Sequence, residues 1–221
     1  TAGAETRAGV YQVVVQQNAT QGSIQYVALS TPSAGTFTIN GYTITISDGD
    51  SFDTVKTKIN NLKAQTGVEA TGTAPSVTLQ AGNIADTSAG VSAFKGLDPN
   101  AQYRLSFSLA SNSVALQKST DGGTTWTNVG SAVAWSSGAT VSLGSSTEQV
   151  TVKLASSAPA ADSTQGLSLV SGGLILRTTA VGSSATINIS GDNAVLRSLG
   201  LVAASDTSTS VLSAAGTDAR G

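Results

Sequence analysis

The residues of this chain that could do chemistry are few, and the clearest of them lie in short turns. None of the 221 residues is Cys or His, so the usual thiolate nucleophile, general base and metal-binding imidazole are all absent. Asp48 and Asp50 offer the hard oxygen ligands that Ca²⁺ prefers. Two carboxylates in a turn before a helix more often cap that helix. We therefore expect no catalytic residue, no cofactor and no metal site.

The sharpest local pattern is Ser119-Thr120-Asp121-Gly122-Gly123-Thr124-Thr125-Trp126, which fits S-x-D-x-G-x-T-W. It is similar to the Asp-box hairpin of sialidase-like propellers. In such a turn we expect Asp121 to bind backbone amides, the glycines to accept positive φ, and Trp126 to fold back as an apolar plug. A propeller needs one copy in each blade, and this chain has one copy in all. The pattern predicts a structural hairpin without sialidase activity.

A second hairpin is predicted over residues 36–47. Asn40-Gly41 is the dipeptide that accepts positive φ in a two-residue turn. On both sides of it, apolar residues alternate with polar ones, which is the period of a half-buried strand. These apolar residues are Phe37, Ile39, Tyr42, Ile44 and Ile46.

A helix is predicted near residues 51–65, directly after that hairpin. Its apolar positions are spaced by 3, 4 and 3 residues, so they share one stripe of a helix. Ser51 suits the N-cap position, and Gly67 is placed to stop the helix. One apolar face of the helix must therefore pack on a sheet. The residues of that face are Phe52, Val55, Ile59 and Leu62.

These residues resemble the IN motif of bacterial flagellins and flagellar hook-associated proteins. The matching positions are Ile39-Asn40-Gly41, Gly49-Asp50-Ser51, Ile59-Asn60 and Gly67-Val68-Glu69-Ala70. Residues 173–202 are similar to the strands that close this unit. The resemblance implies one flagellin-IN-like unit with a β-hairpin and a helix, whose two halves are residues 1–84 and 166–221.

Residues 85–165 separate these halves and read as an inserted all-β domain. Tyr103, Leu105, Phe107 and Leu109 alternate with polar residues, and several further short strands are separated by Gly, Ser and Asp turns. Such a pattern favours a small antiparallel β-sandwich or barrel. Ser156–Thr164 reads as the return linker. We predict a two-lobed, mainly β (α+β) chain.

The two tryptophans of the insert have two interpretations. As large aromatics they could form its core, or they could be exposed and contact a partner or a sugar. We favour the core for Trp126. Trp135 has the small neighbours Ala134, Ser136 and Ser137, and we name it as a candidate partner contact.

Composition is typical of an exported surface protein. The chain holds 61 Ser and Thr, only 11% charged residues and a net charge of −2. Nucleic-acid binding needs clustered Lys and Arg, and here 11 are spread along the chain, so we expect no nucleic-acid partner. No apolar run approaches the roughly 18 residues of a membrane span.

Two shorter stretches resemble the filament cap protein family, also called hook-associated protein 2. Residues 8–17 are similar to its G-Y-x-V-x-V-x-Q-x-A strand, although Asn18 stands where Leu is frequent. Ala215-Gly216-Thr217-Asp218-Ala219 is similar to its G-x-D-A stretch. The resemblance implies an extracellular flagellar head that promotes flagellin assembly at the filament tip. Its partners would be flagellin and, in the full-length protein, further copies of itself.

Other interpretations stay open. The chain could be the variable outer domain of a flagellin, or a carbohydrate-binding or adhesion module. Its first residue is not Met, and neither end shows a long heptad pattern. We therefore expect a trimmed head whose polymerising helices lie outside these residues, and an isolated fragment that is a monomer or a weak oligomer.

Overall fold

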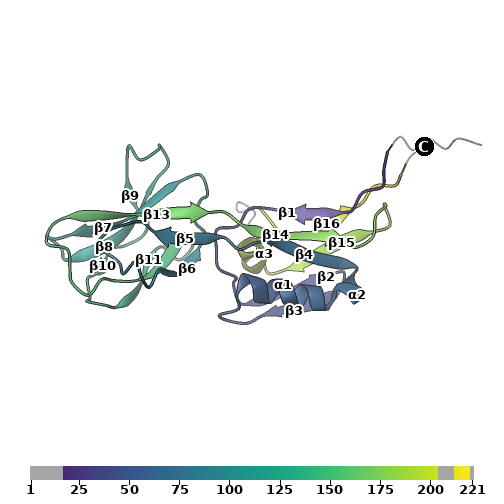
Figure 1. Cartoon of the computed structure of the whole chain (residues 1–221), viewed down its shortest axis with the longest axis horizontal. Helices are drawn as coiled ribbons and strands as arrows, with labels where there is room; N and C mark the ends of the chain where they lie inside the picture. The colour runs from purple at the N-terminus through teal and green to yellow at the C-terminus, as the bar shows by residue number, and fades with distance from the viewer. Residues whose placement is uncertain (1–16, 204–211, 220–221) are drawn as a thin grey trace, which may run out of the picture.

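The computed structural model of the chain describes residues 17–203 and 212–219, which form two lobes along the long axis (Figure 1). The helical lobe comprises residues 17–74, 171–203 and 212–219, and the sandwich lobe comprises residues 75–170. Each lobe has a hydrophobic core of its own. The described residues form sixteen strands and three short helices, which confirms the predicted mainly β fold. The strand predicted at residues 8–17 lies almost wholly outside the described residues.

The helical lobe contains two antiparallel sheets, with the strand orders β16-β15-β2-β3 and β1-β14-β4. Helices α1 and α3 pack against these sheets. The strands are β1 (Ser23–Gln25), β2 (Gly35–Ile39), β3 (Tyr42–Ile46), β4 (Val68–Thr73), β14 (Gly173–Thr178), β15 (Thr186–Gly191) and β16 (Leu212–Ala215). The helices are α1 (Phe52–Asn61), α2 (Lys63–Thr66) and α3 (Asn193–Ser198).

The hairpin predicted at residues 36–47 is present as β2 and β3. Ile39 faces Tyr42 across a two-residue turn. Asn40 and Gly41 have φ values of 49° and 84°, as this turn requires. Gly41 tolerates this φ because it has no Cβ.

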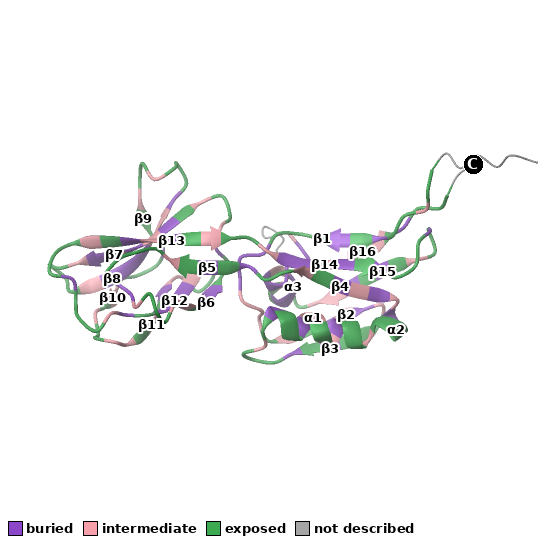
Figure 2. Cartoon of the chain, viewed as in Figure 1, coloured by how far each residue is buried: buried purple, intermediate pink, exposed green. Residues whose placement is uncertain are grey.

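The predicted helix begins where the sequence indicates. Ser51 is the N-cap, and its side chain accepts a hydrogen bond of 3.1 Å from the Thr54 amide. The helix is interrupted at Leu62, so that α1 and α2 replace the single helix expected near residues 51–65. Gly67, with a φ of 67°, ends α2 as predicted. Figure 2 shows the exposed outer face of α1, while its apolar stripe is buried in the core of the helical lobe.

The sandwich lobe consists of two antiparallel sheets with its core between them. The six-stranded sheet has the order β10-β8-β7-β13-β5, with β9 paired to β8, and the second sheet has the order β11-β12-β6. The first sheet contains β5 (Ser76–Leu79), β7 (Gln102–Ser108), β8 (Ser113–Ser119), β9 (Thr127–Asn128), β10 (Val133–Ala134) and β13 (Ser163–Val170). The second contains β6 (Val91–Lys95), β11 (Thr140–Gly144) and β12 (Gln149–Lys153).

The alternation predicted for the first long strand of this lobe holds along β7. Tyr103, Leu105 and Phe107 are buried in the core. Leu109, expected on the same face, is 52% exposed, and that expectation was wrong. The physical reason is that β7 ends at Ser108, so the two-residue period stops before Leu109.

Strands β5 and β13 lie in the same sheet as β7, because β13 pairs with both β5 and β7. Residues 76–79 and 163–170 therefore pack with the sandwich lobe. The expected linker at Ser156–Thr164 runs into β13, whose first residue is Ser163. The division into residues 1–84 with 166–221 and an insert at 85–165 stays a prediction.

Candidate functional site

The joint between the lobes is built from two chain connections and a loop. β4 continues into β5, and β13 continues into β14. The loop at residues 26–34, which we call the strap, leaves the helical lobe after β1 and returns to it at β2. On the way, the Thr31 amide donates to the Phe94 carbonyl at 2.8 Å, and the Leu97 amide donates to the Leu29 carbonyl at 3.2 Å. Leu29 is buried in the sandwich core, so the strap fastens the two lobes together.

The strap is also bonded to the helical lobe. The Ala28 amide donates to the Gly172 carbonyl at 2.7 Å, and the Ser33 amide donates to the Ser198 hydroxyl at 3.0 Å. A crevice of about 600 Å³ lies beside it, lined by the strap, by the loop at residues 95–99 and by part of α3. Residues of both lobes line this crevice.

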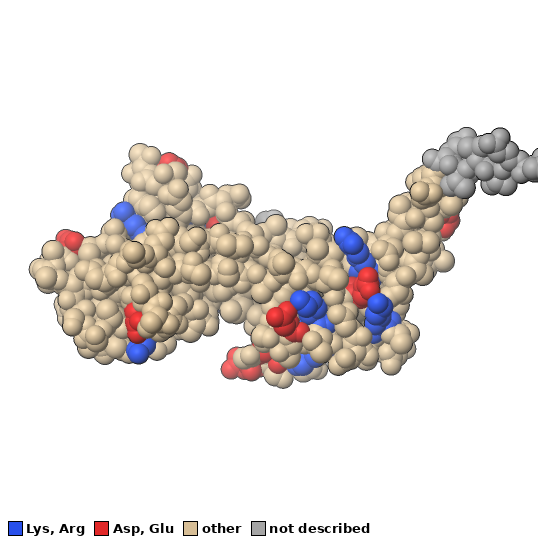
Figure 3. Space-filling model, in the orientation of Figure 1, with Lys and Arg blue, Asp and Glu red and all other residues tan. Residues whose placement is uncertain are grey.

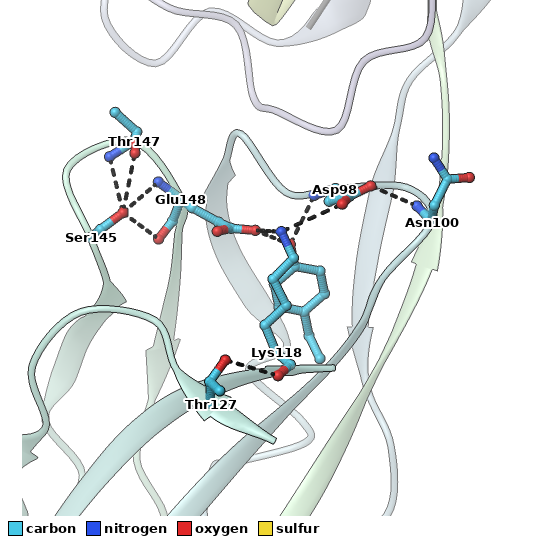
Figure 4. Close-up of polar contacts among 8 residues, drawn as sticks. Asp98, Asn100, Lys118, Thr127, Ser145, Thr147 and Glu148 are labelled. Atoms are coloured by element: carbon cyan, nitrogen blue, oxygen red, sulfur yellow. Dashed lines mark hydrogen bonds and ion pairs between the residues drawn. The ribbon is translucent and has the colours of Figure 1, made fainter. Parts of the chain in front are cut away.

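An ion cluster lines the sandwich side of this crevice (Figure 4). Lys118 Nζ lies 3.0 Å from Glu148 Oε1 and 3.4 Å from Asp98 Oδ2. The Tyr103 hydroxyl donates to Glu148 and accepts a hydrogen bond of 2.9 Å from the Asp98 amide. The cluster thus joins β7 and β8 to the loops beside β6 and β12, and it closes the end of the sandwich that faces the helical lobe.

The surroundings shift the pKa values of two groups in this cluster. Burial raises the pKa of Tyr103 far above its usual range, and the hydrogen bond to Glu148 adds to the shift. Partial burial alone would lower the pKa of Lys118. The hydrogen bond and charge of Glu148, with the charge of Asp98, outweigh it and raise that pKa. Lys118 therefore stays charged and Tyr103 stays protonated, so the lysine and its two carboxylates form a fixed ion pair.

Two Ile-Asn pairs hold the hairpin and helix of the helical lobe in place. Ile39 and Ile59 are fully buried. The Asn40 side chain donates to the Thr66 carbonyl at 2.8 Å and accepts from the Asn188 amide at 2.8 Å. In this way Asn40 ties the hairpin turn to the end of α2 and to β15.

Asn60 makes the matching contact from α1. Its side chain accepts a hydrogen bond of 2.8 Å from the Ala70 amide and donates one of 2.9 Å to the Ala70 carbonyl. Ala70 belongs to β4, an edge strand of its sheet. Both polar backbone groups of Ala70 are thus satisfied on the side where no neighbouring strand pairs.

The turn before α1 carries an ion pair. Lys58 Nζ lies 2.5 Å from Asp50 Oδ2 and also donates to the Thr45 carbonyl of β3. The Lys58 hydrogen bond, with one from the Ser47 amide, holds the pKa of Asp50 below its usual value. Across residues 17–203 and 212–219, no three acidic side chains lie together as a metal ion would need.

The Asp and Gly residues of the S-x-D-x-G-x-T-W turn have the predicted construction. Asp121 accepts hydrogen bonds from the amide and the hydroxyl of Thr125, and Ser119 donates to it at 2.7 Å. The two hydrogen bonds from Thr125, then that from Ser119, hold the pKa of Asp121 far below its usual range. Gly122 and Gly123 have φ values of 72° and 93°. The turn is a structural hairpin.

The two tryptophans lie in different surroundings. Trp126 is half-buried outside the core cluster, and the Arg104 guanidinium lies 4.1 Å from its ring centroid, so the core placement was wrong for it. It follows a turn on the outer side of the sheet, where a polar side chain covers it. Trp135 packs at the edge of the core, with its ring centroid 5.4 Å from that of Phe107. Its role as a partner contact stays a prediction.

Sequence reasoning missed the ion cluster and the strap. Asp98, Tyr103, Lys118 and Glu148 come from four separate elements and share no local pattern. The only signal was a lysine on a strand at a position that faces the tyrosine of the neighbouring strand.

No helix of the described residues is long and apolar enough to cross a membrane.

The hairpin and the first helix of the helical lobe lie in the part of the chain that matches a known family model. The family model described as the flagellin hook IN motif matches residues 36–83, from β2 to just beyond β5, and supports a flagellar protein family. No curated protein and no solved structure matches the chain.

Proposed function

We propose that the chain is the head of a filament cap protein, which promotes flagellin assembly at the filament tip from outside the cell. It acts by shape and reversible contact, with flagellin and further copies of itself as partners. The match to the flagellin hook IN motif supports the flagellar part of this proposal. The cap role depends on the G-x-D-A stretch near the end of the chain.

The observation that carries the proposal is how this stretch closes the helical lobe. Thr20 pairs with Thr217 in an antiparallel bridge, so the two arms of the described chain lie side by side. A Cβ on Gly216 would lie 2.1 Å from the Thr20 carbonyl oxygen, so this close approach needs glycine. Asp218 accepts hydrogen bonds of 2.7 and 2.6 Å from the amide and hydroxyl of Ser183. This pairing of the two arms is the geometry that we expect of a head domain attached through two neighbouring chain segments.

We also propose that the sandwich lobe is an insertion into the IN-like unit. Its separate core supports this view. Because β5 and β13 pair within the sandwich lobe, we place the junctions between β4 and β5 and between β13 and β14. The variable outer domain of a flagellin is the alternative function, and the match at residues 36–83 is equally consistent with it.

The experiment that tests the cap proposal is the mass in solution of this fragment and of the full-length protein, by light scattering behind a sizing column. We expect a small closed ring for the full-length protein and a monomer or weak oligomer for the fragment. A full-length monomer that grows into long filaments on seeding would contradict the cap role and support the flagellin alternative. A stable ring of the isolated fragment would show that the head itself drives assembly, against the proposal.

A further inference from the structure

The outer face of the six-stranded sheet carries a row of polar residues that flagellar assembly does not explain. Asn128, Gln117, Arg104 and Gly166 occupy facing positions on β9, β8, β7 and β13. The Gln80 amide donates to the Gly166 carbonyl at 2.9 Å, which places Gln80 at the far end of the row. The row thus crosses the sheet from one edge to the other, and at Gly166 it has no side chain.

Arg104, at the centre of the row, is held in place by its neighbours. Its Nε donates to Gln117 Oε1 at 2.8 Å, and Gln117 Nε2 donates to Asn128 Oδ1 at 3.0 Å. Its guanidinium stacks 4.1 Å from the ring centroid of Trp126. These contacts fix the guanidinium and reduce the entropy that it would lose on binding a ligand.

The charge of Arg104 has no acidic partner among the described residues. None of the ion pairs of residues 17–203 and 212–219 includes it, and its two terminal nitrogens make no hydrogen bond there. Charges of either sign are sparse on the face of the sandwich lobe that Figure 3 shows. A fixed, half-buried guanidinium with free donors is suited to a carboxylate, which it binds in a bidentate manner.

A shallow groove of about 530 Å³ lies beside Arg104, where the Gln80 side chain covers Gly166. Its lining includes Gln80, Gln102, Thr164 and Trp126. Amide side chains offer both donors and acceptors, and hydroxyls do the same. Such a set matches the neighbouring hydroxyl groups of a sugar ring. Apolar residues also line the groove, namely Pro99, Ala101, Leu167 and Leu169, but most of its exposed surface is polar.

We propose that this groove binds an acidic glycan, a sugar chain that carries carboxylate groups. Arg104 pairs with one carboxylate, and the amides of Gln80 and Gln102 hydrogen-bond to ring hydroxyls. The site borders the joint, with which it shares Pro99, and none of its lining residues belongs to the arms used in assembly. It would give the flagellar head an adhesive function, so it goes beyond the structural role proposed above.

The test is titration of the 221-residue chain with a hexamer of galacturonic acid, followed by calorimetry and by amide shifts in NMR spectra. We expect binding in the millimolar range or tighter, with shifts at β7 and β13. The methyl-esterified hexamer keeps the sugar rings and loses the charge, and we expect it to bind at least 10-fold more weakly. Absence of hexamer binding, or equal binding of the ester, would overturn the proposal.

Two variants and a matched control complete the test. Arg104→Gln should weaken binding at least 10-fold, whereas Arg177→Gln, which removes an exposed charge from β14, should leave it unchanged. Gly166→Ala should weaken it several-fold, because the added Cβ meets Gln80 Oε1 and pushes that side chain into the groove. Equal losses in Arg104→Gln and Arg177→Gln, or equal affinity for a hexaglutamate peptide, would show that only net charge is sensed and would refute the glycan site.

Discussion

The helical lobe and the sandwich lobe bury cores of similar size, nineteen and seventeen residues, yet different polar contacts hold them together. In the helical lobe, neutral side-chain amides of Asn40 and Asn60 bind backbone groups of other strands. In the sandwich lobe, charged groups meet at one end, around Lys118 and Glu148. Neutral contacts of this kind respond little to pH, whereas the ion cluster depends on it. The helical lobe has ion pairs too, Lys56 with Asp53, Lys58 with Asp50 and Lys63 with Glu69. Among the residues that the structure describes, however, only the sandwich lobe combines a lysine and a tyrosine whose pKa values are raised, so the two lobes should respond differently to alkaline pH.

Two spectroscopic signals report on the lobes separately. Both tryptophans, Trp126 and Trp135, lie in the sandwich lobe, so tryptophan fluorescence follows that lobe. All three described helices lie in the helical lobe, so circular dichroism at 222 nm is weighted toward it. The unfolding of the two lobes in urea can therefore be compared in one sample.

The largest expected effect comes from Ile59→Ala, which removes a fully buried side chain from the face of α1. We expect a loss of about 2–5 kcal/mol in the free energy of unfolding of the helical lobe, since the change leaves a cavity. Ile59→Val should cost only about 0.5–1.5 kcal/mol. The transition at 222 nm should shift far more than the fluorescence transition. Equal shifts would mean that the strap makes the lobes unfold as one unit.

Lys118→Met tests the ion cluster of the sandwich lobe. It leaves Glu148 and Asp98 without their counter-charge, with side chains only 19% and 37% exposed. We expect the fluorescence transition to lose about 1–3 kcal/mol, below the value of a fully buried pair because water screens these charges. Lys153→Met, which breaks a 3.7 Å pair with Asp86 at the surface, is the control and should cost less than about 0.5 kcal/mol. If the two variants lose similar free energies of unfolding, the ion cluster stabilises the sandwich lobe no more than a surface ion pair does.

Alkaline pH should weaken the sandwich lobe through the same cluster. The folded state raises the pKa of Tyr103 and of Lys118, whereas the unfolded chain releases these protons near pH 10. The stability that they contribute is therefore complete below about pH 10 and is lost as the pH rises further. We expect the fluorescence midpoint in urea to fall as the pH rises above about 10. The midpoint of the Tyr103→Phe variant should fall less steeply with pH. An identical slope in the variant and the unchanged protein would contradict the role of Tyr103 in this pH dependence.

Asn60→Ala addresses the neutral contacts of the helical lobe. It removes both hydrogen bonds to Ala70, so we expect a loss of about 1–2 kcal/mol in the transition at 222 nm. Asn61→Ala, one residue further along α1, makes no such contact and serves as the control. If the two variants lose the same free energy of unfolding, the hydrogen bonds of Asn60 do not stabilise the lobe, and only the isoleucine of the Ile-Asn pair does.

The smallest effect is expected at the Asp121 turn, which lies at the surface of the sandwich lobe. Asp121→Ala removes the acceptors of the Thr125 amide, so exchange of that amide with deuterium should become faster. Asp121→Asn keeps one acceptor oxygen and should show a smaller change. Unchanged exchange in both variants would mean that the glycines at 122 and 123 form this turn without the carboxylate.

The features that the sequence predicts are those that depend on local contacts. The hairpin at Asn40-Gly41, the cap at Ser51 and the stop at Gly67 depend on neighbours within the chain, and each is found where its pattern places it. The mainly β fold is likewise confirmed. Contacts between residues a few positions apart leave a local pattern that can be read directly.

The remaining features depend on residues that are far apart. Glu148 meets Tyr103 only after two sheets have packed together, and no spacing indicates that contact. Trp126 was placed in the core because large aromatics usually lie there, but it follows a turn on the outer face, where Arg104 covers it. The break at Leu62 is a local change in backbone angles that the helical stripe does not encode.

The measurement that tests the central claim most directly is the position of this head on intact flagella. Antibodies raised against the 221-residue fragment and labelled with gold can be seen by electron microscopy on cells that make the full-length protein. A cap protein predicts label at the filament tip alone. Label along the whole filament would contradict the cap role and identify a flagellin outer domain, and filaments without label would contradict both.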